Sequence, residues 1–202
     1  MENFFANIYK EPRIIAFMTL WMWIAGGIVV LAGIILIYYY NRFALLENRI
    51  ENSFSQIDVQ LKKRTDLVPN LMESVKGYMK HEKGIMTEVT NARKALVGAG
   101  KDINKKLKAD GALESALGRL FAIAENYPNL KASENFVQLQ EELSAIEDKV
   151  AYARQFYNDS ILDYDNLFST FPGNMFAKLF SKKQKEYLKI AESERKVPKV
   201  EF

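Results

Sequence analysis

The sequence contains no cysteine and a single histidine, His81, in 202 residues. The lack of cysteine excludes disulfides, thiolate metal sites, thiol catalysis and lipoprotein anchoring at a cysteine, and leaves the redox compartment undetermined. Helical bundles that hold two metal ions use Glu-x-x-His motifs, and none is present. His81 lies between Lys80 and Glu82, where a solvated histidine is favoured over a metal ligand.

A strong excess of either charge is also lacking. The 28 Lys and Arg against 25 Asp and Glu give a net charge of +3, which argues against a dedicated nucleic-acid-binding protein. Glycine-rich phosphate loops and the Gly-x-Ser-x-Gly motif are absent. The paired acids Glu141-Glu142, Glu147-Asp148 and Asp163/Asp165 diverge in direction on a helix, so we expect a solvated face. We therefore predict no enzyme and no cofactor.

Charge is entirely missing from residues 14–40, which Lys10 and Arg13 precede and Arg42 follows. Roughly 20 apolar residues cross about 30 Å of hydrocarbon, so this run predicts one transmembrane helix. Aromatic side chains near both ends are typical of membrane-interface belts. They are Trp21, Trp23, Tyr38, Tyr39 and Tyr40. A cleaved signal peptide is the alternative, but the run is too long for one and no small-x-small cleavage site follows.

Basic residues near the span favour its C-terminal side, which predicts a cytoplasmic C-terminal domain by the positive-inside rule. Those on that side are Arg42, Arg49, Lys62, Lys63 and Arg64.

Small residues recur seven positions apart inside the span, as Ala25-Gly26 and Ala32-Gly33. They share one helix face, and such faces let helices approach closely in lipid. This predicts homo-oligomerisation or docking on another membrane protein. The alternative is that glycine and alanine are simply frequent in spans.

Beyond residue 40, apolar side chains recur in steps of three and four, the pattern of helices that bury one face. The first stripe is Phe43, Leu46, Ile50, Phe54, Ile57 and Leu61. The second, expected to lie on one helix, is Leu71, Val75, Tyr78, Ile85, Val89, Ala92 and Leu96. The third is Leu113, Leu117, Leu120 and either Ile123 or Ala124. The fourth is Phe136, Leu139, Leu143, Ile146, Val150, Ala153, Tyr157, Ser160, Tyr164, Leu167 and Phe171.

Helix breakers divide the stripes. Pro69 predicts either a kink or a break with a new helix starting near Thr65 or Asp66. Glycines at 98 and 100, a polar connector at 101–111, Pro128 and Pro172-Gly173 mark the later limits.

The pattern predicts an all-α protein, with an N-terminal transmembrane helix continuous with an antiparallel four-helix bundle. The predicted divisions are a short segment at 1–13, the span at 14–40, the bundle at 41–172 and a basic amphipathic segment and tail at 173–202.

The last division interleaves lysines with bulky apolar side chains. Such a segment can lie on an anionic bilayer, gaining about 1 kcal/mol per nearby basic side chain. A short helix and tail packed on the bundle is the alternative. The candidate lipid-binding residues are Lys178, Lys182, Lys183, Lys185 and Lys189.

Eight motifs are specific enough to indicate a family. They are NRF (41–43), ENSFSQIDVQLKKR (51–64), DLVPNL (66–71), VKGYMKHE (75–82), AENYPNLK (124–131), ENF (134–136), RQFYND (154–159) and FPGN (171–174). From residue 40 onward the chain resembles the bacterial LemA family. Residues 1–12 depart from it by their length, which favours an extra interfacial turn.

The resemblance implies a helical bundle on a single span in the bacterial inner membrane, with no established enzymatic activity. It also implies partners among envelope proteins, such as membrane metalloproteases. We predict a scaffold or adaptor, and alternatively a protein that binds or shapes the membrane surface through its C-terminal segment. Several polar side chains are either caps and inter-helix hydrogen bonds or a partner surface: Asn52, Gln56, Asp58, Asn126, Tyr127, Asn158 and Asp159.

Overall fold

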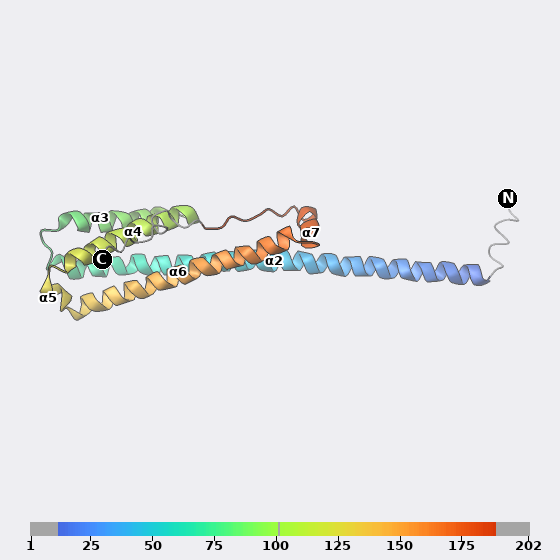
Figure 1. The fold of residues 1–202 in the computed structure, drawn as a ribbon, viewed down its shortest axis with the longest axis horizontal. Helices are drawn as coiled ribbons and strands as arrows, with labels where there is room; N and C mark the ends of the chain where they lie inside the picture. Colours follow the sequence, from blue (N-terminus) through green and yellow to red (C-terminus); the bar gives the residue numbers. More distant parts are fainter. Residues whose placement is uncertain (1–11, 101, 189–202) are drawn as a thin grey trace, which may run out of the picture. The chain divides into compact units, whose positions relative to one another are not determined.

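The computed structural model describes residues 12–100 and 102–188, and over these ranges the chain is helical with no strand. The helices are α2 (Pro12–Lys76), α3 (Lys83–Gly98), α4 (Ile103–Ala124), α5 (Pro128–Lys131), α6 (Glu134–Ser169) and α7 (Gly173–Leu179) (Figure 1). The all-α prediction is confirmed. The predicted N-terminal segment, apart from the start of α2, and the tail from residue 189 lie outside the described residues.

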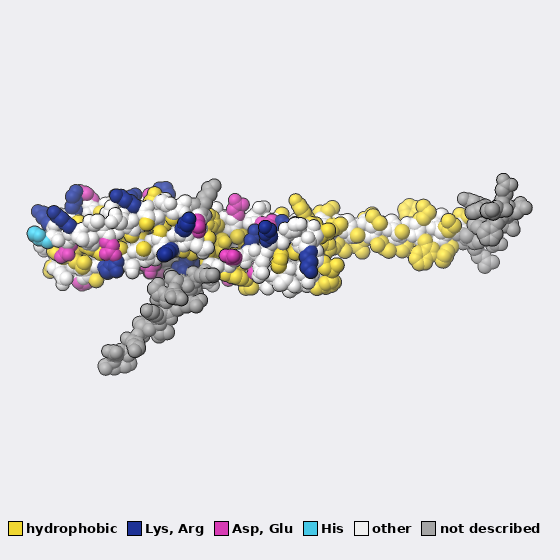
Figure 2. All heavy atoms as spheres, turned by 90° about the horizontal axis from the view of Figure 1, so that it is seen from above, with side chains coloured by type: hydrophobic (Ala, Val, Ile, Leu, Met, Phe, Trp, Pro, Cys, Tyr) yellow, Lys and Arg dark blue, Asp and Glu magenta, His cyan; other side chains and the backbone are white. Residues whose placement is uncertain are grey.

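The N-terminal part of α2 is the long apolar helix that the sequence predicts. An 18-residue window of it has a mean hydropathy of 2.5, and none of that window is buried. Figure 2 shows hydrophobic side chains distributed along this segment. One exposed apolar helix of this length fits a single-pass membrane protein. The predicted continuity with the next helix is confirmed, because α2 runs unbroken to Lys76.

The chain forms two compact units. The first, which we call the anchor unit, comprises Met1–Glu47 and Tyr164–Gln184, and the second, the core unit, comprises Asn48–Asp163 and Lys185–Phe202. In the anchor unit, the buried hydrophobic side chains are Phe43, Leu46, Tyr164 and Ala177. They come from α2, α6 and α7, so three separate stretches of sequence build this small core.

Helices α2, α3, α4 and α6 supply the hydrophobic core of the core unit. All four predicted stripes contribute to it, because their three-and-four spacing keeps the apolar side chains on one face of each helix. Its members include Ile57, Leu61, Leu71, Val75, Ile85, Val89, Leu96, Leu113, Leu117, Leu120, Phe136, Leu143, Ile146 and Val150. Leu188 from the extended segment after α7 joins the same core.

The second stripe and two single stripe positions differ from the prediction. The second stripe does not lie on one helix, because α2 ends at Lys76 and a turn separates it from α3. In that turn Tyr78 is 45% exposed, and its neighbour Met79 is fully buried instead. Phe171 is 79% exposed, since α6 ends at Ser169 and helical spacing no longer sets its direction.

The predicted connector at 101–111 is also wrong. Helix α4 begins at Ile103, and the side chain of Asp102 accepts hydrogen bonds from the backbone N–H groups of Asn104 and Lys105 at 3.0 and 3.1 Å. An aspartate cap satisfies N–H groups that a helix start leaves open, so polar composition does not prevent a helix here. The third helix is consequently longer than predicted.

Pro69 lies inside α2, so the helix continues through it and no new helix starts near Thr65. An internal proline removes one helical hydrogen bond.

Candidate functional site

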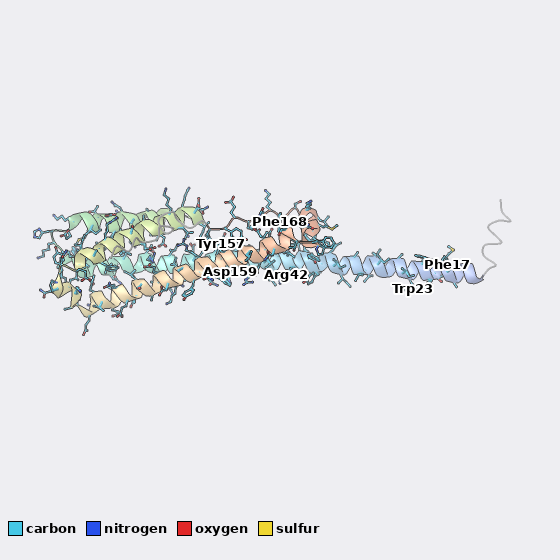
Figure 3. The ribbon with its side chains drawn as sticks, viewed as in Figure 1. Phe17, Trp23, Arg42, Tyr157, Asp159 and Phe168 are labelled. Carbon is cyan, nitrogen blue, oxygen red and sulfur yellow. The ribbon has the colours of Figure 1, made fainter. Side chains whose placement is uncertain are left out.

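The predicted belt residues project from α2 at two levels. Trp21 and Trp23 are exposed near its N-terminal end, where Figure 3 labels Trp23 beside Phe17. Tyr38 and Tyr40 are exposed close to Arg42, and Tyr39 is half-buried. Amphipathic aromatic rings favour the headgroup region of a bilayer. Their membrane role stays a prediction.

The small-residue face of the span is open. Ala25, Gly26 and Ala32 are exposed and Gly33 is half-buried. A Cβ added at Gly26 or Gly33 would meet nothing within 4 Å among the described residues. This face has room for another helix, and its use for association stays a prediction.

An aromatic collar holds α7 against α2 in the anchor unit. We define it as Tyr39, Tyr40, Phe43, Tyr164, Phe176 and Phe180. Tyr39 stacks on Phe176 with ring centroids 4.4 Å apart. Phe180 meets Tyr40 edge-on at 5.6 Å and Phe43 at 6.4 Å. Such aromatic pairs add about 0.5–1.5 kcal/mol each beyond burial of their area, so the collar fixes α7 at the end of the apolar segment.

Gly173 explains how α7 comes so close to the end of α6. A Cβ at this position would lie far inside the van der Waals contact of the Leu167 carbonyl oxygen. Only glycine fits a backbone approach of this kind. The glycine of the FPGN motif is therefore a packing requirement of the collar.

Tyr164 joins the aromatic collar to the segment that follows α7. Its hydroxyl donates a 3.0 Å hydrogen bond to the backbone carbonyl of Lys183. Burial raises the pKa of Tyr164 to about 12, with the negative charges of Glu47 and Asp165 as further causes. Asp165 departs from the predicted solvated acidic face, because it is buried and accepts from the side chain of Gln184 at 3.4 Å.

The candidate lipid-binding lysines occupy different surroundings. Lys178 and Lys183 are exposed. Lys182 is largely buried and forms a 2.7 Å ion pair with Glu47, which occupies its ammonium group. Lys185 is half-buried in the extended segment that precedes Leu188, and Lys189 lies outside the described residues. Their lipid contacts stay a prediction.

In the core unit, Arg64 is a buried charge that the sequence analysis did not single out. Its side chain is 2% exposed, and one terminal nitrogen lies 2.7 Å from Asp110 of α4. Glu114 and Glu147 lie 3.9 and 3.8 Å from the same guanidinium group. A buried charge is tolerated when a partner of opposite sign and hydrogen bonds replace water. The Nε of Arg64 is buried with no hydrogen-bond partner in the described part of the chain.

A signal for this pair is visible in the sequence after the fact. Arg64 continues the first stripe three positions after Leu61 and four before Val68, and Asp110 lies three positions before Leu113. Both charges therefore fall on core positions of their helices.

A groove of about 1030 Å³ opens between α4 and α6 above Arg64. Its walls combine polar side chains, among them Asn104, Gln140 and Glu147, with apolar ones such as Leu117 and Phe121. In the described residues no group of three or more His, Cys, Asp or Glu side chains could hold a metal ion. The groove offers hydrogen-bonding groups, charges of both signs and apolar side chains, which together suit the mixed surface of a protein partner.

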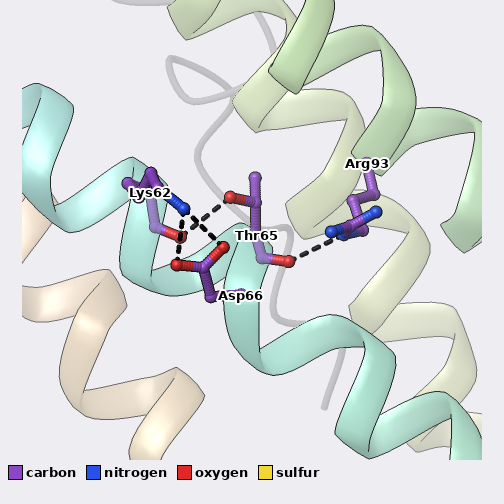
Figure 4. Close-up of polar contacts among 4 residues, drawn as sticks. All are labelled: Lys62, Thr65, Asp66 and Arg93. Carbon is purple, nitrogen blue, oxygen red and sulfur yellow. Dashed lines mark hydrogen bonds and ion pairs between the residues drawn. The ribbon is translucent and has the colours of Figure 1, made fainter.

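A second polar network surrounds Thr65 of α2, one helical turn before Pro69 (Figure 4). The Nε of Arg93, from α3, donates to the Thr65 carbonyl at 2.7 Å, and the Thr65 hydroxyl donates to the carbonyl of Lys62 at 2.8 Å. Lys62 also pairs with Asp66 at 2.7 Å on the exposed face.

The polar residues predicted to form either inter-helix hydrogen bonds or a partner surface include examples of both environments. Asp58 pairs with Lys106, the Tyr127 hydroxyl donates to Glu82, and the Asn158 side chain accepts from the N–H of Leu188. Asn52 and Gln56 instead line a smaller surface groove with Tyr152. Asn126 and Asp159 are exposed (Figure 3 labels Asp159).

Comparison with known proteins identifies relatives. The LemA family model matches residues 53–202. Magnetosome protein MamQ of Magnetospirillum gryphiswaldense is 25% identical over 92% of this chain and 79% of its own length. Magnetosome protein MamQ 2 of Paramagnetospirillum magneticum is 26% identical over 75% of this chain and 65% of its own. Protein LemA of Metamycoplasma hominis is 28% identical over 65% of this chain and 60% of its own length. The match therefore spans less than two thirds of the length of MamQ 2 and of this LemA protein.

Proposed function

The chain belongs to the LemA family, and from this premise we propose that it is a non-enzymatic, single-pass membrane scaffold or adaptor. It presents its helical domain to partner proteins of the bacterial envelope. The observation that carries the proposal is the groove between α4 and α6, which is lined by both polar and apolar side chains and includes Arg64 in its lining. Such a surface can bind a polar helix or loop of a partner with directional hydrogen bonds.

The proposed architecture is one membrane span followed by a helical bundle. The apolar part of α2 crosses the inner membrane, and α2, α3, α4 and α6 form an antiparallel four-helix bundle in the cytoplasm. The slight excess of basic residues after the span supports this orientation. Coiled-coil-like packing of the open small-residue face at Ala25, Gly26, Ala32 and Gly33 joins copies of the chain. Membrane metalloproteases are the partner class that the family resemblance favours.

Site-specific photocrosslinking in intact membranes tests the scaffold. Gln140 and Gln155 are both exposed glutamines of α6, but only Gln140 lines the groove. A crosslinker at Gln140 is expected to trap a protein partner that one at Gln155 does not. Equal trapping at both positions, or none at either, would contradict use of the groove.

A second candidate function is binding of the membrane surface by the C-terminal segment. The exposed ammonium groups of Lys178 and Lys183 favour it. Anionic lipids attract basic side chains near the surface, so neutralising both lysines is expected to weaken association of the segment with anionic bilayers. Unchanged association would exclude this function.

A further inference from the structure

Three large apolar side chains stand exposed in and beside α7. Phe171, Met175 and Leu179 are 79, 60 and 64% exposed. Met175 and Leu179 lie four positions apart in α7 and so share one helix face, and Phe171 lies in the turn just before the helix. Exposed apolar side chains that cluster in this way indicate a surface used for contact.

The opposite side of α7 is already packed. Ala177 is buried, Gly173 lies against the Leu167 carbonyl, and Phe176 stacks on Tyr39. The helix is thus docked by one face, and the three exposed side chains are left on its outside.

The contacts of α7 show where its exposed face lies along α2. Its partners Tyr39 and Tyr40 are the residues with which the uncharged segment of α2 ends. Tyrosines at the end of a span lie at the headgroup level of a bilayer. The exposed face of α7 therefore lies at the level at which the exposed apolar segment of α2 ends.

The exposed charges of the described part of the anchor unit are of one sign. Among the described residues of the anchor unit, the exposed charged side chains are Arg42, Lys178 and Lys183. Its two acids are not on the surface in this way, because Asp165 is buried and Glu47 pairs with Lys182. An apolar face with a basic rim matches the interfacial region of an anionic bilayer.

We propose that Phe171, Met175 and Leu179 form a lipid-contacting face, which inserts into the interfacial region of the same bilayer that α2 crosses. Arg42, Lys178 and Lys183 contact the anionic headgroups around it. The inference rests on the proposed single-pass anchor and adds a second, interfacial contact, in which α7 lies in the membrane surface.

Depth-dependent fluorescence quenching tests this face in the full chain. Because the sequence has no cysteine, Met175→Cys or Leu179→Cys provides one site for an environment-sensitive label. Val29→Cys in the span and Gln155→Cys on α6, both exposed, are matched controls. The proteins are reconstituted in vesicles of phosphatidylcholine and phosphatidylglycerol with a nitroxide-bearing lipid. Its quencher lies just below the headgroup for the labels at 175, 179 and 155, and deep in the acyl chains for the label at 29.

Labels at 175 and 179 are expected to lose emission, because an interfacial face lies about 5–10 Å into the headgroup and acyl boundary, while the label at 155 is unaffected. Removing phosphatidylglycerol is expected to reduce the quenching at 175 and 179. Quenching at 29 with none at 175 or 179 would overturn the inference and leave the anchor standing. Shielding of 175 and 179 from both the lipid quencher and aqueous iodide would also overturn it, because a protein then covers the face. No quenching at 29 would overturn the anchor and this inference together.

Discussion

The Nε of Arg93 donates a 2.7 Å hydrogen bond to the backbone carbonyl of Thr65. Thr65 lies four positions before Pro69, so its carbonyl is the acceptor that the N–H of residue 69 would reach in an uninterrupted helix. Proline has no N–H, and a side chain from α3 takes its place. The Thr65 carbonyl, which lacks its usual helical donor, is thereby hydrogen-bonded by the neighbouring helix.

This relationship predicts coupling between residues 93 and 69. Arg93→Met is expected to destabilise the protein by about 1–3 kcal/mol, because it leaves a buried carbonyl without a donor. In the Pro69→Ala background the cost is expected to be smaller, since the alanine N–H restores the helical bond. Urea unfolding of the full chain in mild detergent, followed by circular dichroism, measures the four variants of the cycle.

The neighbouring Lys94→Met is the control, because Lys94 is exposed on the same helix. It is expected to change the free energy of unfolding by less than about 0.5 kcal/mol. Equal costs of Arg93→Met with and without Pro69 would show that the hydrogen bond does not compensate for the proline.

The buried pair of Arg64 and Asp110 predicts an asymmetric response to substitution. Asp110→Asn is expected to cost about 3 kcal/mol, because it removes the buried counter-charge of the guanidinium and leaves only the more distant Glu114 and Glu147. Replacing both partners together, as Arg64→Met with Asp110→Leu, is expected to cost less. The same urea unfolding experiment compares them with Asp163→Asn, which breaks the exposed pair with Arg49. A cost for Asp110→Asn no larger than for Asp163→Asn would contradict burial of the pair.

Two glycines are expected to respond to alanine in opposite directions. Gly173→Ala forces a Cβ into the Leu167 carbonyl and is expected to cost about 1–3 kcal/mol. Gly111 lies inside α4 with nothing near its Cβ position, so Gly111→Ala is expected to stabilise by about 0.5–1 kcal/mol. Thermal unfolding measures both, and hydrogen exchange should show faster exchange of α7 only in Gly173→Ala. Stabilisation by Gly173→Ala would argue against the close approach.

The raised pKa of Tyr164, about 12, predicts a loss of stability at alkaline pH. In the unfolded chain the tyrosine ionises near pH 10, whereas in the folded protein burial keeps it protonated to higher pH. The folded state therefore binds more protons above pH 10, so this contribution is complete below that pH and is lost as the pH rises through about 12. The difference in tyrosinate absorbance between wild type and Tyr164→Phe measures the transition. A midpoint near pH 10 would contradict the buried environment.

Periodicity made much of this fold predictable. The absence of charge from residues 14–40 indicates the exposed apolar helix, and steps of three and four place side chains such as Ile57 and Val150 in the core. The same pattern fails where the backbone leaves the helix, as at Tyr78 and Phe171, because spacing sets direction only inside a regular element.

The buried ion pair of the core unit was not predicted, because its members are charged residues. Arg64 and Asp110 occupy core positions of their stripes, but a charge is expected in the core only when its partner is known. That partner is 46 residues away in the sequence. The capping of α4 by Asp102 was missed for a related reason, since the basic residues that follow it resemble a loop in composition.

By itself, the sequence determined that the protein is helical, that it carries one long apolar helix without charge and that it belongs to its family. These properties depend on local composition and on periodicity along the chain. Only the tertiary structure decided that Arg64 meets Asp110, that Arg93 replaces the N–H of Pro69 and that α7 docks on Tyr39 and Tyr40. Each of these contacts joins residues far apart in the chain, and their energies depend on distance and burial, which a pattern of spacing does not contain.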